Sequence, residues 1–420
     1  MTTAPVTVPL VARTVPIPDP GPLLGLLPRT GPLAWVRRRE GLVGWGETLR
    51  IRTTGVHRFA DAEAAWLDLV GHAVVRDEVG LPGTGPVAFG SFAFSPDSPA
   101  GGVLVVPQVV VGRRGDQWWL TTTSLGRVVP PATLPETDDE PVLWHGEVTF
   151  ADGARSSVEW ETVVAEAIRR IGAGSLEKVV LARDLDVLAE RPVDVRSLLG
   201  RLANRYPGCW TFSVDGLVGA TPEMLVRREK GLVTSRVLAG TIRRTGDDEH
   251  DLALAASLAR SSKDGEEHEY AVRSVAEALA PHCTSMNVPE SPFVLHLANV
   301  MHLATDVTGV LRDDTTSLGL AAALHPSAAV CGTPTELAAQ VIAEVEGMDR
   351  DRYAGPVGWM DAQGDGEWGI ALRCGRVDAE DDRRLRLFAG CGIVAGSDPE
   401  RELAESNAKL VPMRDSLSAG

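Results

Sequence analysis

The sequence lacks the features of membrane, secreted and nucleic-acid-binding proteins. No apolar run in its 420 residues approaches the roughly 18 to 20 residues of a membrane-spanning helix. Prolines interrupt the first 20 residues, which therefore do not resemble a signal peptide. We expect a cytoplasmic protein with no membrane partner.

Cysteine is scarce and scattered. The five cysteines form no CxxC pair, and their odd number argues against a disulfide framework or a cysteine-rich zinc site. We assign all of them to packing: Cys209, Cys283, Cys331, Cys374 and Cys391.

A formal net charge of −16 without a basic cluster disfavours nucleic acid and anionic lipid as partners and favours a small molecule. Lysine is also scarce, with only Lys178, Lys230, Lys263 and Lys409 against thirty-seven arginines. A desolvated lysine can lose its proton near neutral pH and act as a base, which an arginine cannot do. The alternative is chance composition.

The order of segments predicts an α+β protein. Residues 1–30 are rich in proline and glycine and are expected to be an irregular lead-in, and residues 31–150 alternate short apolar runs with turns, as in a β-rich region. Residues 151–420 mix strand-like segments with helical patterns. One helix is expected to begin near residue 158, and further helices are expected over 248–280, 333–346 and about 398–415.

Two single residues could carry acid–base chemistry. Strand alternation in EKVVLARD places Lys178 on the same face as Val180 and Ala182, where its amine could be partly desolvated. A lysine that reaches solvent from a strand edge is the alternative. Glu223 follows a turn in GATPEML, where it could act as an acid or be an exposed turn residue.

Carboxylates gather in two later segments. Residues 263–270, KDGEEHEY, bring several glutamates together, a set suited to Mg²⁺ or to a solvated helix face. Ser397, followed by Glu400, predicts the start of a helix with Ser397 as its cap. Glu402, Glu405 and Lys409 would then share one face, which could bind a metal and an anion or form surface ion pairs.

Eight blocks stand in the order EKVVLAR, GATPEMLVRR, VLAGTIRR, KDGEEHE, MHLATDVTG, ALHPSAAVCGTP, DRYAGPVGWMDAQGDGEWGIALRC and RLFAGCGIVAGSDPERELAESNAKL. Together these blocks resemble the chorismate-utilising family, which includes isochorismate, salicylate, anthranilate and aminodeoxychorismate synthases. They span residues 155–415, whereas the N-terminal third matches weakly. The resemblance implies one large fold, a twisted β-sandwich flanked by helices.

The resemblance also implies roles for individual residues. Lys178 matches the base that activates water for attack at ring C2 of chorismate, and Glu223 matches the acid that protonates the departing C4 hydroxyl. Glu267 and Glu405 match Mg²⁺ ligands, with Glu402 as a further or water-mediated ligand. The residues implied to hold substrate are Gly240, Thr241, His302, Tyr353, Arg373, Gly390, Gly392 and Lys409.

Within the family, Lys178 and Ala239 resemble the branch that adds water rather than ammonia. The expected activity is a Mg²⁺-dependent isochorismate synthase of menaquinone or siderophore biosynthesis, a monomer without a glutaminase partner. The alternatives are a salicylate synthase, which also eliminates pyruvate, and a non-catalytic chorismate-binding homologue. One departure from the family pattern is HPSAAVCG, where Ser327 and Ala328 replace Thr and Pro.

Overall fold

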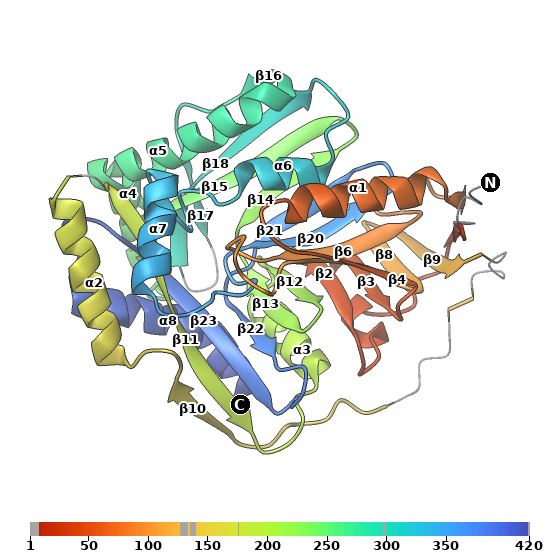
Figure 1. Cartoon of the computed structure of the whole chain (residues 1–420), viewed down its shortest axis with the longest axis horizontal. Helices are drawn as coiled ribbons and strands as arrows, with labels where there is room; N and C mark the ends of the chain where they lie inside the picture. The colour runs from red at the N-terminus through yellow and green to blue at the C-terminus, as the bar shows by residue number, and fades with distance from the viewer. Residues whose placement is uncertain (1–7, 127–132, 135–139, 175, 297–299, 419–420) are drawn as a thin grey trace, which may run out of the picture.

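The structure is a computed structural model that describes residues 8–126, 133–134, 140–174, 176–296 and 300–418. The side chains of residues 239, 241, 243, 262–264, 266 and 267 lie outside this description. The described strands form two large sheets, and every strand pairing is antiparallel except that of β1 with β5 (Figure 1).

The first sheet combines strands from both ends of the chain. In spatial order it contains β10 (Val148–Asp152), β11 (Lys178–Ala189), β23 (Arg384–Ile393), β22 (Cys374–Val377), β13 (Leu217–Thr221), β12 (Trp210–Val214), β2 (Leu33–Arg37), β3 (Glu40–Trp45), β8 (Val109–Arg114), β9 (Gln117–Leu125), β1 (Leu10–Pro16) and β5 (Val74–Asp77), and β19 (Gly332–Thr333) pairs with β11.

The second sheet is also assembled from distant segments. It contains β16 (Cys283–Asn287), β18 (Val300–Leu311), β15 (Leu232–Arg243), β14 (Met224–Glu229), β21 (Gly366–Ile370), β20 (Pro356–Asp361), β6 (Val87–Phe92), β7 (Gly102–Val106) and β4 (Leu49–Thr53), and β17 (Phe293–His296) pairs with β18.

Helices cover the outer faces of this sandwich (Figure 1). α1, α5 and α6 pack on the second sheet, whereas α3 and α8 pack on the first sheet and α7 lies beside β11. Their bounds are α1 (Arg58–Gly71), α2 (Ser157–Gly172), α3 (Val195–Arg205), α4 (Asp248–Arg260), α5 (Ser262–Leu279), α6 (Ser317–Leu324), α7 (Thr335–Val345) and α8 (Pro399–Leu417), with short 3-10 helices at Leu23–Leu26 and Ala280–His282.

Large aromatic side chains fill the space between the sheets. Trp35 and Phe212 come from the first sheet, Phe89 and Trp359 come from the second, and all four are buried. Alternation along each strand sends one set of side chains inward, so this aromatic layer follows from the period of two that the sequence shows. The fold expected from the sequence, an α+β sandwich flanked by helices, is therefore present.

Two of the points at which the chain crosses between the sheets are neighbours. β13 of the first sheet is followed by β14 of the second after only Pro222 and Glu223, and β21 of the second is followed by β22 of the first after Ala371, Leu372 and Arg373. Because β14 pairs with β21 and β13 with β22, the two crossings lie side by side. Glu223 and Arg373 are thereby placed at the junction of the sheets.

The structure corrects four expectations about elements. Residues 10–16 are not an irregular lead-in but form β1, which pairs with β9 and β5. The β-rich region also contains α1. The helix expected over 248–280 is two helices, α4 and α5, and the cap of α8 is Asp398 rather than Ser397, since the Asp398 carboxylate accepts a hydrogen bond from Arg401 N.

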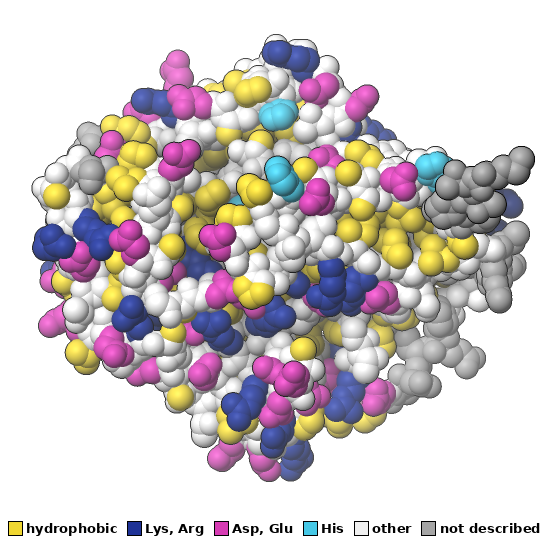
Figure 2. Space-filling view, in the orientation of Figure 1, with side chains coloured by type: hydrophobic (Ala, Val, Ile, Leu, Met, Phe, Trp, Pro, Cys, Tyr) yellow, Lys and Arg dark blue, Asp and Glu magenta, His cyan; other side chains and the backbone are white. Residues whose placement is uncertain are grey.

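Acidic and basic side chains are interspersed on the face shown in Figure 2, without a continuous basic field among the residues drawn in colour. In the described part of the chain, every helix is too short or too polar to cross a bilayer.

Candidate active site

A cavity of about 610 Å³ lies where the two sheets separate, close to the crossings of the chain. It brings together all but two of the residues implied by the family resemblance, although they come from distant parts of the sequence. These residues are Lys178, Glu223, Gly240, His302, Tyr353, Arg373, Gly390, Gly392, Glu402, Glu405 and Lys409. The side chains of the remaining two, Thr241 and Glu267, lie outside the described residues.

Lys178 begins β11, and its side chain extends across the neighbouring strand β23. A Cβ atom at Gly392 would stand 3.0 Å from Lys178 Cε, so any other residue at position 392 would crowd the lysine. At Gly390 a Cβ atom would lie 2.8 Å from the Leu181 carbonyl and 3.1 Å from the Tyr353 hydroxyl. The two glycines therefore keep one wall of the cavity open, because side chains there would fill it.

Glu223 is held at the first crossing by backbone hydrogen bonds. Its N–H donates to Thr221 Oγ1 at 3.2 Å, and its carbonyl accepts from Ile370 N at 3.1 Å. Burial raises the pKa of its carboxyl to about 7, although Arg373, Lys178 and Lys409 act in the opposite direction. Desolvation outweighs the three cations, so the carboxyl can carry a proton near neutral pH.

Arg373 and Tyr353 form the neighbouring part of the wall. Arg373 lies at the second crossing with a φ of 49°, a left-handed conformation that is uncommon for residues other than glycine. The Tyr353 ring stacks on Phe388 with 5.2 Å between ring centroids and an interplanar angle of 10°. A cation and a phenol hydroxyl thus face one cavity from rigid supports, an arrangement suited to a carboxylate ligand.

Gly240 and His302 line the opposite wall, which belongs to the second sheet. The register between β15 and β18 shifts between residues 239 and 241, which makes a bulge, and Gly240 adopts a φ of 69° there. Bulges re-aim the strand beside functional sites. Burial lowers the pKa of His302 to about 4, with Arg373 and Lys409 adding to the effect and a hydrogen bond with the Gly240 backbone opposing it. The imidazole is therefore neutral at pH 7.

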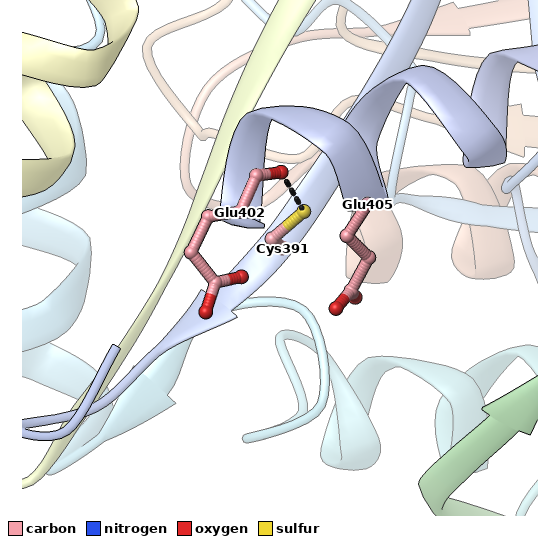
Figure 3. A group of neighbouring side chains, drawn as sticks. All are labelled: Cys391, Glu402 and Glu405. Carbon is pink, nitrogen blue, oxygen red and sulfur yellow. Dashed lines mark hydrogen bonds between the residues drawn. The ribbon is translucent and has the colours of Figure 1, made fainter. Parts of the chain in front are cut away.

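Two carboxylates of α8 extend toward the same side of the helix (Figure 3). Oxygens of Glu402 and Glu405 and the sulfur of Cys391 all lie within 4.8 Å of one another. Lys409 Nζ contacts Glu405 Oε1 at 2.6 Å and donates to the Gly390 carbonyl at 2.9 Å. The spacing of three and seven residues predicted this shared face from the sequence.

The donor set at α8 fits a hard divalent cation. Mg²⁺ prefers oxygen ligands and is commonly held by one or two carboxylates together with water. Burial raises the pKa of the Cys391 thiol to about 12, and its Sγ donates to the Glu402 carbonyl at 3.3 Å, so it packs as a protonated thiol. Glu402 and Glu405 are the groups in this cluster that could hold Mg²⁺.

Several cavity residues escaped sequence reasoning. Arg350 and Arg401 add cationic groups, and Tyr270 adds an exposed aromatic ring. Ala328, which the sequence already marked as a departure from the family pattern, also lies on the wall. The sequence contains thirty-seven arginines, so nothing in local spacing singled out Arg350 or Arg401. Only the order of the elements in space shows that they belong to the site.

An acid, an amine and a carboxylate pair that line one cavity between two sheets are features of the active site of a small-molecule enzyme. The family described as "Chorismate binding enzyme" matches residues 34–418, and the chain belongs to that family.

Named relatives support the same assignment. The isochorismate synthase DhbC of Bacillus subtilis (strain 168) is 41% identical over 267 residues, which cover 61% of this chain and 66% of the relative. The isochorismate synthase MenF of the same organism is 30% identical over 374 residues, covering 82% of this chain and 78% of that protein. The solved structure of MenF, the menaquinone-specific isochorismate synthase from Escherichia coli, superimposes with a TM-score of 0.82 at 26% identity, covering 99% of this chain and 96% of that chain.

Proposed function

We propose that this protein converts chorismate to isochorismate by adding water at ring C2 and removing the C4 hydroxyl. The observation that carries the proposal is the meeting of Lys178 and Glu223 in one cavity beside the Glu402–Glu405 pair. The names of the relatives agree with it. In this proposal residues 151–420 are the catalytic region, and residues 31–150 complete the sandwich.

The proposed reaction needs one base and one acid. Lys178 Nζ accepts a proton from water as the water oxygen bonds to C2, the ring double bonds shift, and the C4–O bond breaks. Glu223 donates its proton to the departing hydroxyl, which leaves as water. A carboxyl with a pKa of about 7 is suited to this step because general acids work best when their pKa lies near the operating pH.

The anionic substrate would be held by the cations and backbone groups of the cavity. Arg373 and Tyr353 would bind the enolpyruvyl carboxylate, while Lys409, Gly390 and Gly392 would approach the ring carboxylate. Gly240, Thr241 and the neutral His302 would lie along the ring. These positions are carried over from the family resemblance and are consistent with the cavity lining.

Magnesium is the proposed cofactor. Glu402 and Glu405, together with Glu267, would hold it, and the bound ion would supply positive charge to the ring carboxylate. The chain's own residues would position the substrate and move the two protons.

Product analysis tests this proposal. Purified protein is incubated with chorismate in the presence of Mg²⁺ or EDTA, and the products are identified by chromatography and mass. We expect isochorismate in equilibrium with chorismate, with no reaction in EDTA. Incubation in ¹⁸O-water should place the label at C2, because the added oxygen comes from solvent.

Other outcomes would assign another function. Salicylate and pyruvate would identify a salicylate synthase, and tight binding of chorismate without turnover would identify a non-catalytic homologue. The proposed enzyme would serve menaquinone or siderophore biosynthesis and act as a cytoplasmic monomer without a glutaminase partner. Sedimentation at enzyme-assay concentrations checks the oligomeric state.

A further inference from the structure

The strand that carries Lys178 has an incomplete edge. On one side β11 pairs with β23 along nearly its whole length. On the other side it pairs with β19 at Lys178 and Val179 and with β10 from Leu185 onward. Among the described residues, no strand pairs with this side at residues 180–184. Buried backbone groups need hydrogen-bond partners, so this gap has to be satisfied in another way.

Side chains from the end of α7 and the following loop satisfy it. Ala182 N donates to Glu346 Oε1 at 2.7 Å, and Arg350 Nη2 donates to the Val180 carbonyl at 2.6 Å. Val180 N donates to the Cys331 carbonyl at 2.8 Å, and the Ala182 carbonyl accepts from Trp160 Nε1 at 3.2 Å. Glu346 and Arg350 thereby bind two of the backbone groups that a neighbouring strand would otherwise bind in the stretch that directly follows Lys178.

The same two side chains also fix the adjoining loop. Arg350 Nη1 donates to the Val330 carbonyl at 2.9 Å, and its Nε donates to Glu346 Oε2 at 2.9 Å. The side chains of Glu346 and Arg350 are 1% and 3% exposed. Arg350 and Val330 both line the cavity, so the pair joins the lysine strand to the wall beside it.

We propose that Glu346 and Arg350 form a clamp that holds β11 in the position from which the Lys178 amine reaches the reacting water, and that they are positioning residues for the reaction. The inference rests on the proposed function. A buried ion pair with several backbone partners has one well-defined geometry, which suits it to fixing the register and height of a strand. A displacement of about 1 Å at a catalytic group can cost on the order of 10²-fold in rate.

Hydrogen exchange tests the clamp without reference to activity. In Glu346→Leu the acceptor of Ala182 N is lost, and exchange should accelerate in peptides covering residues 180–184. Peptides covering residues 185–189, where β11 pairs with β10, should remain protected. In Glu346→Gln the amide oxygen can still accept from Ala182 N, so protection should be intermediate. Uniform acceleration along β11 would overturn the proposal, because it would show general destabilisation.

A double-mutant cycle tests the connection with Lys178. Glu346→Gln should lower kcat by about 10- to 100-fold with KM changed by less than about threefold. In the Lys178→Ala background the same substitution should change kcat by no more than about twofold, because the residue that it positions is absent. An equal loss in both backgrounds, or no loss in either, would contradict the proposal.

Asp365→Asn is the matched control. Asp365 and Arg228 form another buried pair, with side chains 6% and 9% exposed, and Asp365 also accepts from Lys230 N at 3.0 Å. Neither side chain lines the cavity. The control should lower the unfolding temperature and leave kcat within about threefold of the wild type. A wild type that turns over no chorismate would contradict the proposed function, whereas the exchange experiment would still decide whether the clamp exists.

Discussion

Residues 10–125 and residues 178–417 contribute strands to the same two sheets, but they differ in what they place between them. The described lining of the cavity comes from residues 177–409, and the earlier part supplies none of it. Residues 10–125 supply bulky buried side chains instead, among them Trp35, Trp66 and Phe89. Residues 10–125 are thus a scaffold that depends on close packing, whereas the later residues form a site in which glycines and charged side chains line an open cavity.

The two parts should therefore respond differently to substitution. Removing a charged group from the cavity should reduce turnover while the fold persists, because these groups line an open space and do not fill the core. Removing a core side chain from the N-terminal part should reduce stability while the surviving folded enzyme keeps its substrate affinity.

The largest expected effect is that of Lys178→Ala. Without its amine the attacking water has no base, and general base catalysis is typically worth ~10²- to 10⁴-fold in rate. We expect kcat for isochorismate formation to fall by that factor, with the unfolding temperature within about 2 °C of wild type. Retention of kcat within a few-fold would show that Lys178 is not the base.

Glu223→Gln should lower kcat by a comparable factor and should also abolish one pH dependence of kcat/KM. Glu223 must be protonated to act as the acid, and its pKa is about 7, so kcat/KM of the wild type should fall as pH rises above 7. The variant should lack this limb of the profile. A profile that keeps the same limb in the variant would assign the titration to another group.

The raised pKa of Glu223 also predicts an effect on stability. The folded pKa is raised above its usual value of 4.5, so ionising Glu223 is harder in the folded protein than in the unfolded chain. Its contribution to stability is thus complete below pH 4.5 and is lost as pH rises through about 7. The unfolding temperature of Glu223→Gln should exceed that of wild type at pH 8 by more than at pH 5. A constant difference would contradict the raised pKa.

The side chains that share a face were predicted from the sequence better than the ends of the elements, for a physical reason. Lys178, Glu402, Glu405 and Lys409 lie in segments whose local period fixes which side chains share a face. Their meeting with Glu223 depends on the two crossings between the sheets, which no local period reveals. Family resemblance supplied that link, and it could not supply Glu346, which binds a backbone N–H of β11 and the Arg350 side chain.

The next prediction concerns the scaffold. Phe89 is fully buried on β6 between the two sheets. Phe89→Ala should lower the free energy of unfolding by about 3 to 5 kcal/mol, the usual cost of removing a large core side chain. Denaturant titration measures that change, and KM for chorismate, determined on the folded fraction at low temperature, should stay within about twofold. A large rise in KM would show that the N-terminal part also shapes the site.

A smaller effect is expected from Glu405→Gln. The variant removes one carboxylate of the proposed Mg²⁺ site and frees Lys409 from its ion pair. The Mg²⁺ concentration for half-maximal activity should rise more than about tenfold, since even outer-shell partners of a metal are worth ~10- to 100-fold in affinity. Glu400→Gln is the control, because Glu400 lies on the same helix but outside the cavity lining. Equal responses of the two variants would remove Glu405 from the metal site.

The first residues of α8 show why the ends of elements were harder to predict than the side chains that share one face of a helix or strand. The sequence favoured Ser397 as the cap because Glu400 follows three residues later. In the structure Ser397 instead accepts a hydrogen bond from Val394 N at 3.2 Å, and Asp398 accepts from Arg401 N at 3.0 Å. Two adjacent residues that both favour caps leave the choice to tertiary contacts of the preceding loop.

The smallest expected effect tests the start of α8. Asp398→Ala should lower the free energy of unfolding by about 1 kcal/mol, since the first turn of α8 loses a cap, whereas Asp398→Asn should retain most of it. Because α8 carries Glu402 and Glu405, fraying of its first turn should also raise the Mg²⁺ requirement slightly in Asp398→Ala and not in Asp398→Asn. Thermal unfolding and a Mg²⁺ titration of both variants make the comparison. Equal stability of the two variants would mean that the hydrogen bond from Arg401 N does not hold the helix start, and that the carboxylate pair is positioned by the packing of α8 on β23 alone.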